Sequence, residues 1–309
     1  MKTLLLLDAN SVIHRSFHAL PPFSGPSGEP TGALYGIASI LLKLWREEKP
    51  AYAAALFDRP EPTFRKKEYA EYKAQRPPAP DDLIAQIIEA HHLFEAFGIR
   101  TFEEPGFEAD DLIATFAERF KKEPDVQVVI LTGDRDTLQL IEDDKIVVRT
   151  FNKGVSDTTT YDEKAVVLKY GFAPSLMVDY KALVGDASDN IKGVSGIGPK
   201  TATELIKKFG NIEKIWKAVP KDPKLAAKLG GREEEAKFSK RLVVLERNVP
   251  LELSGIADIA TSDTTSAIEM YFQKKGFVTL LKRFEKGNAS AENIRKKKEK
   301  PPSRQQAMF

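Results

Sequence analysis

The chain has 309 residues, which is long enough for two domains, because single hydrophobic cores seldom grow beyond about 250–300 residues. It contains no cysteine, so disulfides, thiolate metal sites and a cysteine nucleophile are excluded. The net charge is only +2, from 47 Lys and Arg residues against 45 Asp and Glu residues, so the chain as a whole is neither strongly basic nor strongly acidic.

Strand-like segments alternate with helical patterns in the first half of the chain. Short apolar runs predict strands at 3–8, 51–58, 99–104, 126–134 and 145–150. Apolar residues at helical spacing predict helices between them, at 33–45, 83–97, 109–120 and 137–141. This alternation is typical of a doubly wound α/β fold with a mainly parallel sheet flanked by helices. We expect that fold over residues 1–161.

The strand signal stops near residue 161, and capped helical patterns follow one another up to about residue 286. We therefore expect a second, helical domain over 162–286. From residue 287 the composition becomes polar, basic and proline-containing, so 287–309 is expected to be a flexible basic tail. The apolar run at the start is too short for a signal peptide, and no later run approaches a membrane span. These features predict a soluble cytoplasmic protein without membrane contact.

Nine acidic residues fall at strand ends, turns and helix starts, which an open α/β sheet brings to one edge. They are Asp8, Asp58, Glu108, Asp110, Asp111, Asp134, Asp136, Asp186 and Asp189. Any one of them alone is better explained as a helix cap, a turn residue or a solvated side chain. Together they repel one another unless cations neutralise them, and such oxygen ligands suit Mg²⁺ or Mn²⁺. Two such ions can activate a water and stabilise a leaving oxygen.

The stretch 193–201, GVSGIGPKT, is similar to a nucleotide-binding loop but does not meet the requirements of one. Pro199 stands where a P-loop requires lysine. A Rossmann fingerprint would need a third glycine at Thr201, and no apolar strand leads into this stretch. The loop therefore needs a different explanation.

Five segments resemble, in order and spacing, the motifs of the 5′ nuclease domain of bacterial DNA polymerase I, of phage 5′ exonucleases and of flap endonucleases. They are LLLDANSVIHRSFHAL, ALFDRPEPTFRKKEYAEYKAQRPPAP, EEPGFEADDLIATFA, VVILTGDRDTLQLI and KALVGDASDNIKGVSGIGPKTATELIKKFG. The resemblance covers about residues 3–286. It implies a PIN-like or resolvase-like nuclease core with a helical arch near 62–82. It also implies a helical DNA-binding domain with a helix-hairpin-helix element at 187–210.

The resemblance assigns a metal role to each of the nine acidic residues. The positions that correspond to an inner metal shell are Asp8, Asp58, Glu108, Asp110 and Asp111, and Asp134 shares in this shell. The positions that correspond to the ligands of an outer ion are Asp136, Asp186 and Asp189. We therefore expect two or more Mg²⁺ or Mn²⁺ ions as cofactors.

The resemblance also assigns basic and aromatic residues to the substrate. Those expected to be catalytic are Arg15, Lys73 and Arg76. Those expected to contact DNA are Arg65, Tyr69, Tyr72, Lys181, Gly196, Gly198, Lys200 and Thr201. On its own, the arch segment fits either strand binding by charge and stacking or an exposed amphipathic helix. The 193–201 loop resembles the hairpin of a helix-hairpin-helix element, whose backbone N–H groups bind a duplex phosphate, with a possible K⁺ site.

The predicted function is a structure-specific 5′ nuclease that hydrolyses phosphodiester bonds at 5′ ends and 5′ flaps of DNA, and in RNA primers, by a divalent two-metal mechanism. Two alternatives from other classes are a non-catalytic duplex-DNA-binding module and a ribonuclease with a related small acidic α/β fold. A further alternative is the N-terminal fragment of a DNA polymerase I. No proofreading or polymerase segment follows the basic tail, so we expect a free-standing enzyme.

The last five residues, 305–309, resemble the peptide by which bacterial replication proteins dock on the sliding clamp. Its anchors are expected to be Gln305, Met308 and Phe309, presented on a flexible tether. An arbitrary tail end explains so short a motif equally well. We expect a monomer that associates with DNA in the bacterial nucleoid.

Overall fold

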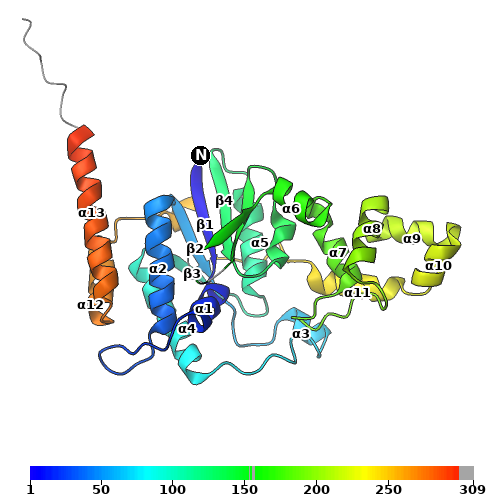
Figure 1. Ribbon diagram of the computed structural model, residues 1–309, viewed down its shortest axis with the longest axis horizontal. Helices are drawn as coiled ribbons and strands as arrows, with labels where there is room; N and C mark the ends of the chain where they lie inside the picture. Colours follow the sequence, from blue (N-terminus) through cyan, green and yellow to red (C-terminus); the bar gives the residue numbers. More distant parts are fainter. Residues whose placement is uncertain (153, 155–156, 299–309) are drawn as a thin grey trace, which may run out of the picture.

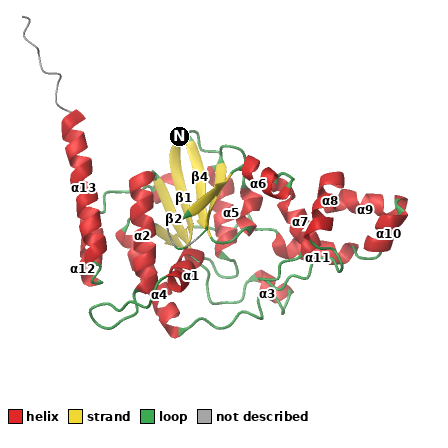
Figure 2. Cartoon of the chain, in the orientation of Figure 1, coloured by secondary structure: helices red, strands yellow, loops and turns green. Residues whose placement is uncertain are grey.

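A single six-stranded sheet forms the centre of the computed structural model, which describes residues 1–152, 154 and 157–298 (Figures 1 and 2). In sheet order the strands are β3 (Arg100–Phe102), β2 (Tyr52–Leu56), β1 (Lys2–Asp8), β4 (Val126–Thr132), β5 (Ile146–Phe151) and β6 (Thr158–Tyr161). The first five strands in chain order are parallel, and β6 pairs antiparallel with β5. The strand order runs outward from β1 to β3 on one side and from β4 to β6 on the other, so the fold is doubly wound.

Helices make most of the connections between the strands, and helices joined by loops form most of the described chain after the sheet (Figure 2). Those that accompany the sheet are α1 (Ala9–Ala19), α2 (Gly32–Glu47), α3 (Phe64–Glu68), α4 (Asp81–Ala96), α5 (Ala109–Phe120) and the 3-10 helix η1 (Asp136–Leu140). Those that follow it are α6 (Glu163–Tyr170), η2 (Pro174–Leu176), α7 (Met177–Val184), α8 (Pro199–Phe209), α9 (Ile212–Ala218), η3 (Val219–Lys221), α10 (Pro223–Leu229), α11 (Glu233–Val243), η4 (Ile256–Ile259), α12 (Thr265–Lys274) and α13 (Val278–Lys298). None of the described helices is both long and apolar enough to cross a lipid bilayer.

Helices cover both faces of the sheet because alternate residues of each strand point in opposite directions. On β1, Leu4 and Leu6 belong to the hydrophobic cluster that contains the apolar face of α5. Leu5 and Leu7 belong to a second cluster with α1, α2 and α4. The four consecutive leucines are therefore all buried, which explains why this strand shows no alternation of polar and apolar residues.

The predicted α/β pattern is confirmed, with differences at two elements that the sequence pattern does not predict. Strand β6 has the sequence TTTY and lies at the edge of the sheet, so it lacks a buried apolar run. Helix α1 begins at Ala9, directly after the last residue of β1, so no turn residues separate the helix from the strand. The helix predicted at 137–141 is the short 3-10 helix η1.

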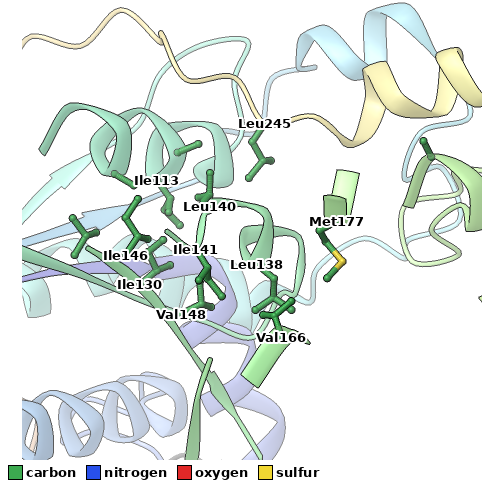
Figure 3. Close-up of a cluster of buried hydrophobic side chains, with 14 of the residues drawn as sticks. Ile113, Ile130, Leu138, Leu140, Ile141, Ile146, Val148, Val166, Met177 and Leu245 are labelled. Atoms are coloured by element: carbon green, nitrogen blue, oxygen red, sulfur yellow. The ribbon is translucent and has the colours of Figure 1, made fainter. Parts of the chain in front are cut away.

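One hydrophobic cluster continues from the sheet into the helical half of the chain (Figure 3). It joins Ile130 of β4 and Val148 of β5 to Leu138 of η1, Val166 of α6 and Met177 of α7. Buried side chains packed at this density hold α6 and α7 firmly against the sheet. The domain boundary predicted at residue 161 therefore lies within a shared core.

The last two helices within the predicted helical domain pack against the α/β core. Helices α12 and α13 lie at the opposite end of the molecule from α8–α10 and pack against α4 and α2 (Figure 1). Phe272, Phe277 and Leu280 are buried there in the same cluster as Leu5 and Leu7. The tail predicted over 287–309 begins within α13, which continues to Lys298. The clamp-binding peptide expected at 305–309 lies outside the described residues.

The helical arch predicted near 62–82 contains one short helix, α3, followed by turns. Pro77, Pro78 and Pro80 oppose any longer helix, because proline lacks the backbone N–H that a helix interior needs. The backbone N–H of Lys73 donates a hydrogen bond of 3.0 Å to the carbonyl oxygen of Asp189, in the loop after α7. The segment is therefore tied down beside the helical half of the chain.

Two glycines allow the loop between α7 and α8 to fold back on itself. Gly185 and Gly193 have φ angles of +81° and +66°, which favour glycine. A Cβ atom on Gly193 would lie 2.4 Å from the backbone nitrogen of Gly185, so neither position has room for a side chain. The two helices that this loop joins are in contact with each other, as a helix-hairpin-helix element requires.

We expect Gly193→Ala to lower the free energy of unfolding by about 2 kcal/mol or more, because the new methyl group meets backbone atoms that cannot move independently. Urea denaturation followed by circular dichroism measures this change. Gly198→Ala is the matched control, since a Cβ there has no atom within 4 Å, and its effect should stay within about 0.5 kcal/mol. Similar effects of the two substitutions would contradict the close approach described here.

Candidate active site

The carboxyl ends of β1 and β4 lie side by side where the strand order reverses, and each strand runs into an aspartate there. Asp8 ends β1, and its Oδ1 accepts the Ser11 N–H at 3.0 Å, which caps α1. Its Oδ2 accepts the Thr132 hydroxyl at 2.6 Å, and Thr132 Oγ1 accepts the Asp134 N–H at 2.9 Å. This chain of hydrogen bonds fixes Asp8 and Asp134 relative to each other.

Asp58 and Asp110 reach the same place from β2 and from the start of α5. The Oδ1 atom of Asp58 accepts the Ala109 N–H at 2.7 Å, so Asp58 satisfies a free backbone donor at the start of α5. Asp110 Oδ1 is buried and has no hydrogen-bond partner among the described residues. Together with Asp8 and Asp134, these two aspartates line one cavity of about 460 Å³. We call these four residues the aspartate cluster.

Burial and repulsion between carboxylates make Asp8 and Asp110 hard to ionise. Burial raises the pKa of Asp8 to about 7; repulsion from Asp58 and Asp134 adds to the shift, while the hydrogen bonds from Thr132 and Ser11 oppose it. Burial also raises the pKa of Asp110 well above its ordinary value, and the charges of Asp8 and Asp134 raise it further. A cation in the cavity would remove the repulsion between these carboxylates, because its positive charge would neutralise them.

The three residues expected to be catalytic, Arg15, Lys73 and Arg76, all line this cavity. Lys73 Nζ lies 2.9 Å from Glu108 Oε1, and Arg76 donates to Asp189 at 2.6 Å. Burial lowers the pKa of Lys73, but attraction to Glu108 and Asp189 outweighs burial and raises it above its ordinary value. Two of the three basic side chains at the cavity are therefore paired with carboxylates.

Arg15 is held away from the carboxylates by the loop between β5 and β6. Its Nε donates to the carbonyl oxygen of Gly154 at 2.9 Å, and a second guanidinium nitrogen donates to that of Asn152 at 2.7 Å. Its place at the cavity agrees with the expected contact with a phosphate, but its assignment as a catalytic residue stays a prediction.

Four residues of α1 line the cavity although the sequence analysis assigns them no role: Asn10, Ser11, His14 and His18. Asn10 Oδ1 accepts the Asp58 N–H at 3.1 Å, and Ser11 Oγ accepts the Gly133 N–H at 2.7 Å. Burial lowers the pKa of His14, and the nearby charges of His18 and Arg76 lower it further. Their spacing is that of one helix face, so a prediction of α1 would have revealed them.

The three aspartates expected to bind an outer ion are each held by basic side chains. Lys181 Nζ contacts Asp136 Oδ1 and lies 2.7 Å from Asp186 Oδ2. Burial raises the pKa of Asp186, but Lys181 and the hydrogen bonds from Ser188 outweigh it and keep the pKa below its ordinary value. Lys181 thus lies between two carboxylates, and its contact with DNA stays a prediction.

Throughout the described ranges, no three acidic or histidine side chains are already arranged around one point as the ligands of an ion. The paired carboxylates explain part of this result, because their oxygens are directed at Lys or Arg. Binding of an ion therefore requires side chains of the aspartate cluster to turn toward it.

Arg65 and Asp111 form a buried ion pair. The DNA contact of Arg65 and the metal role of Asp111 stay predictions, which this pairing does not favour. Arg65 is 1% exposed and Asp111 is 0% exposed. The guanidinium makes two parallel hydrogen bonds of 2.7 Å to Asp111 and donates to the carbonyl oxygens of Leu242 and Val244, both at 2.8 Å. This pair joins α3, α5 and the end of α11.

Glu108 is positioned by the same network. Its backbone N–H donates to Asp111 Oδ2 at 3.1 Å, which forms a capping box at the start of α5. The Tyr72 hydroxyl lies 2.9 Å from Glu108 Oε2 and 3.0 Å from Asp189 Oδ2. Tyr72 is 3% exposed, and its contact with DNA stays a prediction. Tyr69 is half-buried against Phe238, and its contact with DNA stays a prediction.

The loop before α8 is accessible. Gly196, Gly198 and Lys200 are exposed, and Thr201 is half-buried in the first turn of α8. The free N–H groups at the start of that helix face outward beside Lys200, as binding of a phosphate requires. The structure thus leaves these four residues available for the role predicted for them.

Two family models together match most of the chain. The model of the N-terminal resolvase-like domain of 5′-3′ exonucleases matches residues 3–171, and the model of their C-terminal SAM fold matches residues 172–267. The chain belongs to the 5′-3′ exonuclease family. It is therefore a nuclease, which excludes the non-catalytic alternative. The two models meet at 171/172, somewhat beyond the predicted boundary at residue 161.

Individual proteins agree with the family. The 5′-3′ exonuclease of Aquifex aeolicus is 41% identical over 254 residues, which cover 82% of this chain and 85% of that protein. DNA polymerase I of Bacillus subtilis is 37% identical over 293 residues, which cover 94% of this chain and 33% of the polymerase. The exonuclease thus spans about a third of that polymerase's length.

Two solved structures share the fold of the exonuclease. The D15 flap endonuclease of bacteriophage T5, in a pseudo-enzyme–product complex with DNA and metal ions, has a TM-score of 0.64 and 24% identity, over 93% of this chain and 99% of that one. Human GEN1 in complex with Holliday junction DNA has a TM-score of 0.62 and 15% identity, over 98% of this chain and 75% of that one. At these identities the comparison shows a common fold.

We expect the metal-free exonuclease to lose stability as the pH rises from about 5 to 8. The pKa values of Asp8 and Asp110 are raised, so the folded state keeps protons that the unfolded chain has already released. This contribution is lost as the pH passes the folded pKa of Asp8, about 7. In EDTA at pH 8, Asp110→Asn should therefore unfold about 2–4 °C above the parent protein or higher. Thermal unfolding followed by circular dichroism measures the difference.

The difference between Asp110→Asn and the parent should shrink at pH 5, where Asp8 and Asp110 hold more protons. Asp144→Asn is the control, because Asp144 is exposed and should change the unfolding temperature little at either pH. Equal unfolding temperatures for Asp110→Asn and the parent at pH 8 would rule out strong repulsion within the cluster.

We expect Arg65→Met to lower the free energy of unfolding by about 3–5 kcal/mol, because it leaves the charge of Asp111 buried without a partner. Arg241→Met is the matched control: it breaks an exposed pair with Glu68 and should cost about 0–1 kcal/mol. Urea denaturation at pH 7 compares the two. A small effect at Arg65 would show that the pair does not hold α3 and α11 to the core.

Proposed function

We propose that the exonuclease is a structure-specific 5′ nuclease that hydrolyses phosphodiester bonds at 5′ ends and 5′ flaps of DNA and in RNA primers, with two or more Mg²⁺ or Mn²⁺ ions. The observation that carries this proposal is the aspartate cluster. Its carboxylates share one cavity without an ion pair among the described residues, and one buried oxygen of Asp110 has no partner.

The residues present fit a divalent metal. Carboxylate oxygens are the ligands that Mg²⁺ and Mn²⁺ prefer, and the raised pKa values of Asp8 and Asp110 reflect charges that only a cation can neutralise. A structure of the T5 5′-exonuclease, which has the same fold at 24% identity and a TM-score of 0.62, contains divalent zinc ions. We assign Asp8, Asp58, Asp110 and Asp134 to the first ion, with Glu108 beside them.

A second ion would be held by Asp136, Asp186 and Asp189, which the sequence assigns to an outer site. Lys181, Lys73 and Arg76 now balance these charges. An outer ion therefore has to compete with ammonium and guanidinium groups, whereas the aspartate cluster has no such competitor. The first site should accordingly bind metal more tightly than the second.

Bound divalent ions supply positive charge that activates a water and stabilises the leaving 3′ oxygen. The chain itself supplies Lys73 and Arg76 at the rim of the cavity, where they stabilise negative charge on the scissile phosphate. Both now pair with carboxylates, and they become available to the phosphate once those carboxylates are neutralised. Arg15 approaches the same phosphate when it leaves the carbonyl groups that hold it. The products carry 5′-phosphate and 3′-hydroxyl ends.

Duplex DNA beside the 5′ end is bound by the loop before α8. The exposed residues Gly196, Gly198 and Lys200 support this, as does the common fold with proteins solved in complex with DNA. Four further parts of the proposal rest on the sequence alone. They are a K⁺ ion in this loop, a monomeric state, association with the nucleoid, and clamp binding through Gln305 and Phe309.

We expect Asp134→Asn to reduce Mg²⁺-dependent cleavage at least about 100-fold, because it removes a charged ligand from the aspartate cluster. The measurement is cleavage of a 5′-labelled flap substrate with Mg²⁺, with Mn²⁺ and with EDTA, and EDTA should abolish cleavage by the parent enzyme. Asp144→Asn, which removes an exposed carboxylate outside the site, should retain full activity. Undiminished cleavage by Asp134→Asn would refute the assignment.

A further inference from the structure

A basic hollow lies beside the helix-hairpin-helix element, between α6 and α8. Its volume is about 500 Å³, and it is separate from the cavity of the aspartate cluster. Three lysines line it, Lys169 from α6 and Lys200 and Lys207 from the two ends of α8, against one acidic residue, Glu204. The lining thus carries an excess of positive charge.

The positive charge of the hollow is not balanced within the protein. In the part of the chain that the structure describes, no carboxylate forms an ion pair with Lys169, Lys200 or Lys207. Lys169 donates instead to the Tyr161 hydroxyl at 2.6 Å and lies over the rings of Tyr161 and Tyr170, at 4.8 and 5.5 Å from their centres. Three ammonium groups around one hollow repel one another unless an anion lies between them.

The walls of the hollow suit a sugar-phosphate strand better than a small anion. Tyr170 and Tyr180 form part of its surface, and Leu168 stands at its edge with 90% of its surface exposed. An apolar side chain so exposed, next to unpaired lysines, provides contact for sugar faces while the ammonium groups bind phosphates. A free phosphate ion would use only the lysines.

The hollow continues from the hairpin loop. Lys200 is the second residue of α8, directly after the exposed Gly198, and Lys207 is two turns further along the same helix. Seven residues of helix extend about 10 Å, which corresponds to about three phosphates of one DNA strand. A strand that meets the hairpin loop and follows α8 would reach Lys207 and Lys169 within its next few nucleotides.

We propose that this hollow binds the backbone of duplex DNA beyond the hairpin, so that the enzyme contacts a longer stretch of duplex than the hairpin loop alone reaches. The inference rests on the proposed function, since it extends the duplex-binding surface of that nuclease. The contact involves phosphates and sugars, so it is independent of base sequence. It adds affinity for substrates whose duplex is long enough to reach Lys169 and Lys207.

The test compares Lys169→Gln/Lys207→Gln with a control of equal charge, Lys221→Gln/Lys228→Gln, whose two exposed lysines lie outside the hollow. The substrates are 5′ flaps with 6, 12 and 20 base pairs of duplex, which is about half a turn to two turns. Fluorescence anisotropy measures their binding in Ca²⁺ at several salt concentrations. Steady-state cleavage of the same substrates in Mg²⁺ separates kcat from KM.

The hollow variant should bind the 20-base-pair substrate about 10- to 100-fold more weakly than the parent enzyme, and its salt dependence should fall by about one to two ions. Its KM should rise for that substrate, whereas the shortest substrate and the control variant should behave like the parent. Equal losses in both variants, or a loss that is the same for all duplex lengths, would overturn the proposal. A loss that follows the length of the single-stranded flap would overturn it in favour of flap binding. If the parent cleaves none of these substrates, the proposed function fails instead.

Discussion

Repulsion among four aspartates is the constraint on which the rest of this structure depends. The doubly wound sheet brings the ends of β1, β2 and β4 to one edge, and the start of α5 faces them, so Asp8, Asp58, Asp110 and Asp134 meet around one cavity. Backbone N–H groups and the Thr132 hydroxyl fix two of these side chains without neutralising them. The fold therefore maintains an unfavourable arrangement of charge, which is the basis of the proposed metal site.

The other acidic residues of the nine are neutralised by Lys or Arg, and this pairing gives them different roles. Asp111 is enclosed by Arg65, which also binds the backbone at the end of α11. Asp136 and Asp186 share Lys181, which brings η1 and the loop after α7 together. These pairs hold the helical half of the chain beside the cavity, while the unpaired carboxylates of the aspartate cluster stay free for a metal.

The shared hydrophobic core determines how the substrate-binding parts relate to the cavity. Apolar side chains continue from β4 and β5 through η1 into α6 and α7 (Figure 3), and α7 leads into the hairpin loop. The loop before α8 and the basic hollow are therefore attached to the same rigid body as the aspartate cluster. A duplex bound there has a defined position relative to the site of cleavage, which is how a nuclease selects one phosphodiester bond.

The sequence by itself determined the α/β core, the position of the site and the family. Asp8 ends one parallel strand and Asp134 lies two residues beyond the end of another, and parallel strands place their carboxyl ends on one edge whatever the details of packing. Only the tertiary structure decided which acids are free. Arg65 lies 46 residues from Asp111, and no local spacing identifies that pair. Only packing showed that α12 and α13 return to α4 and α2, because their apolar residues fit any buried surface equally well. Local patterns specify elements, whereas charge pairing and packing partners depend on distances that exist only in the folded chain.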